Sequence, residues 1–157
     1  MTAFDKALAL ILQHEGGYVN DLRDPGGETK YGISKRAYPA EDIKDLTVDR
    51  AGELYKRDYW DKLRCDELPP AVAVVAFDIA VNQGPGAAVK ILQESVRATQ
   101  DGILGPKTIE AAKKMGHRAA AEMTAIRIRR YIVTPNFATY GAGWIRRAVT
   151  TAVEAVA

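Results

Sequence analysis

The run from Ala71 to Gln83 constrains the fold of this chain more than any other segment. It follows Pro69-Pro70, and proline is favoured in the first turn of a helix, where its missing N–H costs nothing. The side chains that follow are apolar on nearly every side of the expected helix. Because such a helix must be covered all round, we expect it to lie at the centre of the fold.

The rest of the chain also reads as mostly helical. Apolar residues recur at helical spacing from Phe4 to Leu12 after the cap Thr2, and again after the cap Thr47 as far as Trp60. Four more helices are expected over residues 85–92, 106–115, 118–133 and 136–153. The length of 157 residues, with no linker or repeat, fits one domain. We therefore predict a mainly α, single-domain fold with at most a small β-hairpin.

A polar, glycine-rich segment follows the first helix: residues 14–34, HEGGYVNDLRDPGGETKYGIS. Gly16-Gly17 ends the helix, so Glu15 falls in its last turn, and Asp24 precedes the turn Pro25-Gly26-Gly27. If the chain doubles back here, Asp24 faces Glu15. Paired carboxylates suit glycoside hydrolysis, in which one protonates the leaving oxygen and the other stabilises or attacks the sugar cation, or activates water. Alternatively, Asp24 is a solvated turn residue, and spacing alone leaves both interpretations open.

The same segment resembles the N-terminal signature of the glycoside hydrolase family 108 lysozyme-like muramidases, which include phage endolysins and secretion-associated peptidoglycan hydrolases. Glu-Gly-Gly-Tyr, Asn, Asp, Gly-Gly, Thr and Tyr-Gly-Ile are present in order, and the departure is Leu22-Arg23, where we expect a proline and a variable residue. The resemblance implies a lysozyme-like fold. It also implies site residues: Glu15 as the catalytic acid, Asp24 as the second carboxylate, Thr29 as a polar partner, and Tyr18, Asn20 and Tyr31 as sugar-cleft residues.

A second match covers the distal half, through FDIAVNQG (77–84), ILQ (91–93) and DGILGPKT (101–108). These residues resemble the predicted peptidoglycan-binding region of the same family, which adds Gln83 as a candidate substrate contact. The segment is too short to form a stable separate module. We therefore expect one lysozyme-like domain over residues 1–157, with an N-terminal catalytic lobe over 1–66 and a helical lobe over 67–157.

The resemblance implies an N-acetylmuramidase that cleaves the β-1,4 bond between N-acetylmuramic acid and N-acetylglucosamine. One alternative is a lytic transglycosylase, which breaks the same bond with the same acid but generally lacks a second carboxylate. The more distant alternative is a non-catalytic peptidoglycan-binding module. The partner in each case is the glycan strand of the cell wall.

The cysteine, histidine and arginine residues bear on which disulfides, metal sites and charged surfaces the chain can form. Cys65 is alone, so no internal disulfide forms, and no His or Cys cluster has the spacing of a metal site; we expect no metal and no cofactor. Net charge is +2, yet five arginines gather in the last third, and we interpret them as a solvated helix face: Arg127, Arg129, Arg130, Arg146 and Arg147. No motif indicates nucleic-acid binding. A monomer is the default expectation.

The N-terminus carries Asp5, Lys6, Gln13 and His14 within its apolar stretch, so it resembles neither a secretory signal nor a membrane span. We expect synthesis in the cytoplasm without a signal peptide and no stable membrane insertion. The family resemblance implies action on the cell wall, in the periplasm, after release by a phage holin or a dedicated secretion route.

Overall fold

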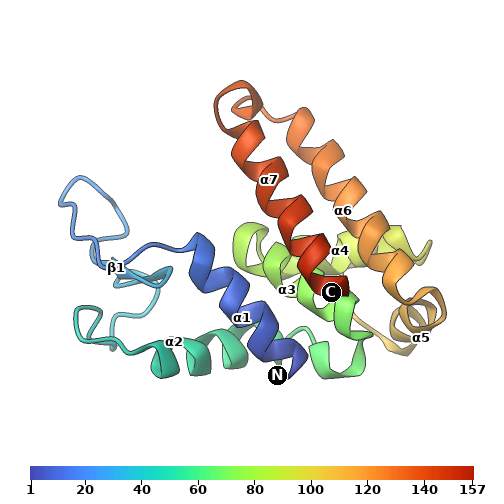
Figure 1. The fold of residues 1–157 in the computed structure, drawn as a ribbon, viewed down its shortest axis with the longest axis horizontal. Helices are drawn as coiled ribbons and strands as arrows, with labels where there is room; N and C mark the ends of the chain where they lie inside the picture. The colour runs from blue at the N-terminus through green and yellow to red at the C-terminus, as the bar shows by residue number, and fades with distance from the viewer.

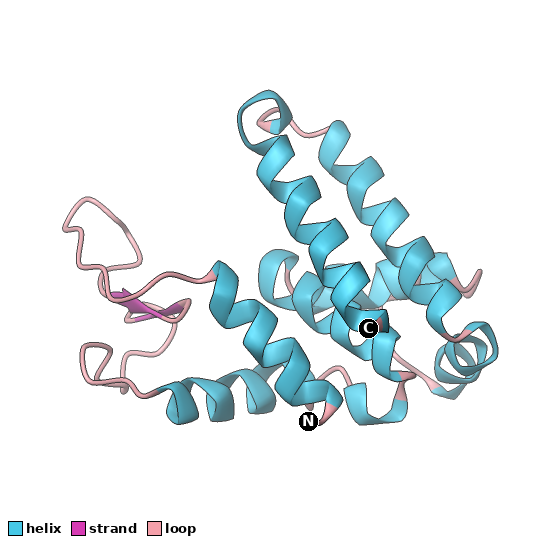
Figure 2. Cartoon of the chain, viewed as in Figure 1, coloured by secondary structure: helices cyan, strands magenta, loops and turns pink.

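The computed structural model describes residues 1–157 and is mainly α-helical, as predicted (Figures 1 and 2). Seven α-helices follow one another: α1 (Ala3–His14), α2 (Val48–Tyr55), α3 (Pro70–Gln83), α4 (Pro85–Ser95), α5 (Pro106–Met115), α6 (His117–Ile132) and α7 (Phe137–Val156). A π-helical turn, η1 (Lys56–Trp60), continues α2, and a short 3-10 turn, η2 (Cys65–Glu67), precedes α3. The helices include no candidate membrane-spanning segment.

Helix α3 is the centre of the fold. Every residue from Ala71 to Ala80 is buried, and α1, α4, α6 and α7 all pack against it. Pro70 occupies its first turn, and Gly84, with φ of 93°, separates it from α4. The prediction of a central helix is therefore confirmed, since the neighbours cover the sides that the sequence left without polar residues.

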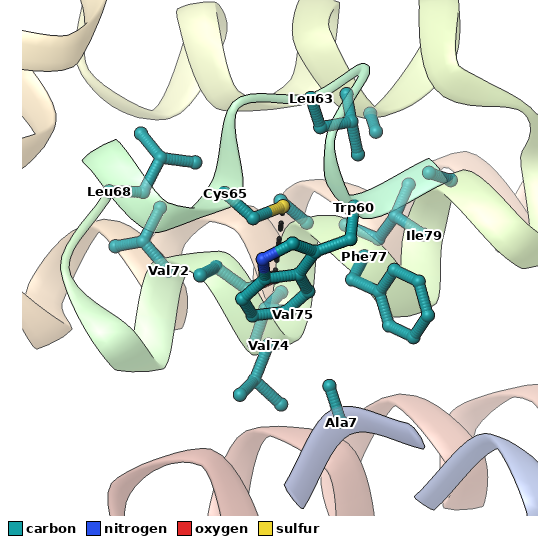
Figure 3. Close-up of a cluster of buried hydrophobic side chains, with 14 of the residues drawn as sticks. Ala7, Trp60, Leu63, Cys65, Leu68, Val72, Val74, Val75, Phe77 and Ile79 are labelled. Carbon is teal, nitrogen blue, oxygen red and sulfur yellow. Dashed lines mark hydrogen bonds between the residues drawn. The ribbon is translucent and has the colours of Figure 1, made fainter. Parts of the chain in front are cut away.

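The core beside α3 is rich in aromatic rings. Phe77 lies edge-on to Phe4, Tyr55 and Trp60, with ring centroids 6.0, 6.2 and 5.6 Å away. Cys65 is buried against the same cluster, as expected for a small apolar side chain (Figure 3). Burial raises the pKa of its thiol well above the ordinary range.

Helix α2 begins after Thr47, whose hydroxyl accepts from Arg50 N–H, as predicted. The sequence did not indicate that the run would end in a π-helical turn, in which Asp61 N–H donates to Lys56 O (2.8 Å). An α-helix separates residues five apart by roughly 140° around its axis, whereas the wider i→i+5 turn brings them closer to the same side. The wider turn thus lets Tyr55 and Trp60 both enter the core, where they are 2% and 1% exposed.

The two strands, β1 (Thr29–Lys30) and β2 (Ile33–Ser34), form one antiparallel hairpin in which Thr29 lies opposite Ser34. Val19 adds a single antiparallel bridge to Thr29. In Figure 1 the hairpin and its loops extend from the end of α1, away from the helical body. The small hairpin predicted beside Glu15 is present. The division into lobes at residue 66 stays a prediction.

Candidate active site

Glu15 lies where the chain leaves α1. Its N–H still donates to the carbonyl of Ile11 (2.9 Å), but its own φ and ψ of −93° and 126° are extended. Gly16 and Gly17 follow with open space around their α-carbons. The Glu15 side chain is 28% exposed. Its carboxyl therefore remains accessible to solvent, although most of the side chain is packed.

The turn of the β-hairpin covers one side of Glu15. Gly32 adopts φ of 76°, and a Cβ at this position would lie 2.9 Å from Glu15 Cγ and 2.3 Å from the Tyr55 hydroxyl. Tyr55 Oη donates to the carbonyl of Tyr31 (2.8 Å), which fixes the turn against the end of α2. Glycine is thus required at position 32 both for its positive φ and for the close approach of Glu15.

A chain of charged groups leads from Glu15 into the core. Arg147 Nη1 on α7 donates to Glu15 Oε1 (3.4 Å), and Arg147 Nε donates to Asp78 Oδ1 on α3 (3.0 Å). Arg147 Nη2 lies equally near that oxygen (3.0 Å) but is not aligned for a hydrogen bond. On its other oxygen Asp78 accepts from Arg127 Nη1 on α6. Two carboxylates and two guanidinium groups therefore alternate from the surface inward.

The inner members of this chain are almost completely buried. Asp78 and Arg127 are 2% and 1% exposed, and Arg147 is 14% exposed. Such groups are tolerated only when each charge has a partner, because a charge left alone in the interior costs several kcal/mol. Arg127 also donates to the Tyr131 hydroxyl, which in turn donates to Asn82 Oδ1 (3.3 Å).

The charged groups next to Glu15 shift the pKa values of two of their neighbours. Burial lowers the pKa of Arg147, but the carboxylates of Asp78 and Glu15 outweigh it and hold that pKa above its ordinary value. Partial burial and the nearby Arg147 cation lower the pKa of His14. Arg147 therefore stays charged beside Glu15 throughout the physiological range.

These contacts overturn one sequence-based interpretation. The arginines of the last third were expected to form a solvated helix face, but Arg127 is buried, the Arg147 side chain is only 14% exposed, and both pair with Asp78. Arg129 and Arg146 are exposed as expected, and Arg130 pairs with Glu94 (2.9 Å). The interpretation was wrong for these two residues because their partner lies on a distant segment.

Asp78 and its partners are the site residues that sequence reasoning missed. A usable signal was present, since Asp78 is the single charged residue of the apolar run 71–83. Aspartate is almost never fully buried unless it is paired. A carboxylate in a central helix therefore calls for cationic partners elsewhere in the chain, and arginine is the usual one.

None of the predicted site residues in the hairpin segment forms a side-chain hydrogen bond with Glu15. Tyr18 donates to Glu28 Oε1 (2.7 Å), and Asn20 is exposed. Thr29 is partly buried on β1, where its hydroxyl donates to Gly27 O (3.4 Å). Tyr31 comes nearest, since its carbonyl holds Tyr55 beside Glu15.

Asp24 lies in an exposed turn. Its Oδ1 accepts from Gly26 N–H (2.8 Å), and its carbonyl accepts from Gly27 N–H (3.0 Å). These are the local bonds that make aspartate favourable in turns. The turn predicted at Pro25-Gly26-Gly27 is therefore present, and its geometry matches the solvated-turn interpretation of Asp24.

Gln83, the candidate contact from the distal half, ends α3 and is half-buried. Its Nε2 is enclosed and has no hydrogen-bond partner. Asn82, beside it, is exposed and takes part in the Tyr131 bond. The structure contains no group of three or more His, Cys, Asp or Glu side chains that could hold a metal ion.

Comparison with known proteins gives two matches. The family model described as glycosyl hydrolase 108 matches residues 8–84, which include Glu15 and Asp78 but neither Arg127 nor Arg147. The solved structure of SagA from Brucella abortus is similar with a TM-score of 0.84 and 35% sequence identity. The similarity covers 98% of this chain and 93% of that chain. No match was found among the curated protein sequences.

The agreement with SagA extends over nearly the whole of both chains, so it includes the hairpin, the central helix and the α6–α7 pair. It confirms the predicted mainly α, single-domain, lysozyme-like fold. Together, the family model and this identity show that the chain belongs to the glycosyl hydrolase 108 family and is a glycoside hydrolase.

Proposed function

We propose that this protein is an N-acetylmuramidase that hydrolyses the β-1,4 bond between N-acetylmuramic acid and N-acetylglucosamine, with Glu15 as general acid. Its family supports a peptidoglycan hydrolase. The observation that carries the assignment of Glu15 is its environment: Gly32, Tyr55 and Arg147 enclose a carboxyl that still reaches solvent. A proton donor must be fixed in position and still touch the glycan.

In this mechanism Glu15 gives its proton to the leaving oxygen as the glycosidic bond lengthens. Arg147 is the positioning residue, because its guanidinium spans Glu15 and Asp78 and so ties the acid to the central helix. A planar guanidinium can bridge two carboxylates in this way, whereas a lysine ammonium is a single point charge. The tie supports a stable orientation of Glu15 before the sugar arrives.

Asp24 is the proposed second carboxylate, and Thr29 is its polar partner. In this role Asp24 acts on the sugar cation or on water opposite Glu15. Tyr18, Asn20, Tyr31 and Gln83 are proposed as contacts to the bound glycan.

A lytic transglycosylase is the second candidate, and the exposed turn of Asp24 favours it. The Asp24 carboxylate accepts a backbone N–H of its own turn, whereas an anhydro-sugar product needs no second carboxylate at Glu15. Mass spectrometry of the released muropeptides separates the two reactions. Reducing ends support the muramidase, and 1,6-anhydro ends would replace it with the transglycosylase.

We also propose that the protein acts as a monomer on glycan strands in the periplasm. It would be released from the cytoplasm by a holin or a dedicated secretion route.

Replacing Glu15 by glutamine tests the proposed acid. Glu15→Gln keeps the shape of the side chain but removes the transferable proton, so cleavage of purified sacculi should fall by at least about a hundredfold, the lower range for loss of a general acid. Reducing ends released per minute give the rate, and circular dichroism checks the fold. Glu154→Gln, on an exposed position of α7, is the matched control. Sacculus cleavage retained by Glu15→Gln would exclude the assignment.

Replacing Asp24 by asparagine tests the second carboxylate. Asp24→Asn can still accept from Gly26 N–H, so the turn should survive while the negative charge is lost. We expect a loss of activity that is large but smaller than for Glu15→Gln. Asp21→Asn is the control, because Asp21 lies in the same loop and pairs only with Arg23. Equal, near-normal rates in both variants would make Asp24 a turn residue.

Replacing Gly32 by alanine tests the packing around Glu15. The positive φ alone should cost about 1–2 kcal/mol of folding free energy, and the new Cβ would also displace Glu15 and Tyr55. Gly102→Ala is the matched control, because Gly102 has the same φ of 76° but meets only the side chain of Lys90. We expect thermal stability to fall in both variants, and to fall further in Gly32→Ala because of the added clashes, with sacculus cleavage reduced at least tenfold in Gly32→Ala alone. Comparable activities would show that the close approach does not matter.

A further inference from the structure

Two aromatic side chains on α7 stand on the helix face that reaches Glu15. Tyr140 precedes Arg147 by seven residues, which is nearly two complete turns, so the two side chains project in nearly the same direction. Trp144 lies between them, four residues after Tyr140 and three before Arg147, spacings that keep neighbours on one face. Arg147 contacts Glu15. The aromatic pair therefore continues, along one helix, a line that begins at the proposed acid.

The two rings are held in a defined arrangement. Tyr140 and Trp144 are stacked, with centroids 5.9 Å apart and planes inclined by 30°. Trp144 is supported from behind by Tyr131 on α6, at 5.3 Å. Tyr131 is in turn held by the buried Arg127 and by Asn82 at the end of α3. The side chains are thus pre-ordered by the core, which lowers the entropy cost of binding a ligand on them.

The outer ring is open to solvent. Tyr140 is 57% exposed, whereas Trp144 is half-buried and Tyr131 is buried. Figure 1 shows α6 and α7 as a helical pair whose tip projects beyond the end of α1, while the hairpin extends on the other side of that end. The α7 side of Glu15 therefore carries an aromatic surface that no other element of the chain covers.

We propose that Tyr140 and Trp144 form a stacking platform for a sugar ring of the same glycan strand whose bond Glu15 cleaves. This inference rests on the proposed function. Seven residues of α-helix span about 10 Å, the length of roughly two pyranose units, so the platform holds sugars one or two units from the scissile bond. The C–H face of a pyranose packs on an aromatic face, and sugar sites combine such faces with a few polar groups.

Asn82 supplies the polar group. It is exposed at the end of α3, and its Oδ1 accepts from the Tyr131 hydroxyl (3.3 Å) behind the platform. Its amide N–H₂ has no recorded protein partner, and this donor suits the carbonyl of an N-acetyl group. Through this Asn82 donor, the platform binds sugars that carry an N-acetyl group in preference to unsubstituted hexoses.

Steady-state kinetics on the tetrasaccharide of alternating N-acetylglucosamine and N-acetylmuramic acid test the platform. Tyr140→Ala should raise KM at least fivefold with kcat nearly unchanged, because stacking away from the reacting bond stabilises ground state and transition state alike. Tyr140→Phe keeps the ring and should keep KM within twofold of the wild type. Val153→Ala is the matched control, since Val153 is 58% exposed on the same helix. An unchanged KM in Tyr140→Ala, or an equal rise in Tyr140→Phe, would overturn the stacking proposal.

A binding measurement separates this proposal from the proposed catalysis. The Glu15→Gln protein is titrated with the same tetrasaccharide while tryptophan fluorescence is followed. Trp60 is 1% exposed in the core, so a ligand-dependent signal should come from Trp144 and disappear in Glu15→Gln/Trp144→Phe. Binding with no signal change would refute the platform even if the wild type is active. Failure of the wild type to cleave the tetrasaccharide would instead refute the muramidase, whatever the fluorescence shows.

Discussion

The alternating charges of Arg127, Asp78, Arg147 and Glu15 join the centre of this protein to its surface. The inner pair is almost fully enclosed, so neither charge can be solvated by water. Removing one partner from such a pair typically costs about 3–5 kcal/mol, because the other charge is left unpaired in the interior. The packing of α6 and α7 on α3 therefore depends on the same series of ion pairs that ends at Glu15.

This arrangement solves a mechanical problem for a glycoside hydrolase. Glu15 sits just beyond the end of α1, where glycines would leave the backbone free, yet its carboxyl must keep one orientation. The hairpin turn at Gly32 closes on one side, and Arg147 holds the other. Helix α7 then serves twice, since the face that carries Arg147 also carries the stacked rings of Tyr140 and Trp144. The residue that holds the acid and the proposed sugar platform therefore share one rigid helix.

Local signals in the sequence were enough for much of the fold. The caps Thr2 and Thr47 and the prolines at 70, 85 and 106 begin helices where they were expected. The run 71–83 is central because a helix that is apolar on nearly every side must be covered by neighbouring helices. The glycine-rich segment after Glu15 forms the small hairpin that its turn residues indicated.

The charge network could not be foreseen in the same way. Asp78 is 49 residues from Arg127 and 69 from Arg147, and Glu15 is 132 residues from Arg147. Helical spacing says which face a residue occupies on its own helix, but it does not say which distant helix will meet that face. The π-helical turn at 56–60 was not predicted for a related reason. It accompanies the burial of both Tyr55 and Trp60 against Phe77, which lies on another helix.

If the bridging guanidinium of Arg147 orients Glu15 from the core, Arg147→Lys should misplace the acid without removing the positive charge. Lysine keeps the positive charge but cannot span both carboxylates. Thermal unfolding and kinetics on sacculi are measured together, with the exposed Arg146→Lys as the matched control. We expect a folded Arg147→Lys protein whose kcat falls at least tenfold with little change in KM, and an unaffected Arg146→Lys protein. A folded Arg147→Lys protein with wild-type kcat would contradict this role of Arg147.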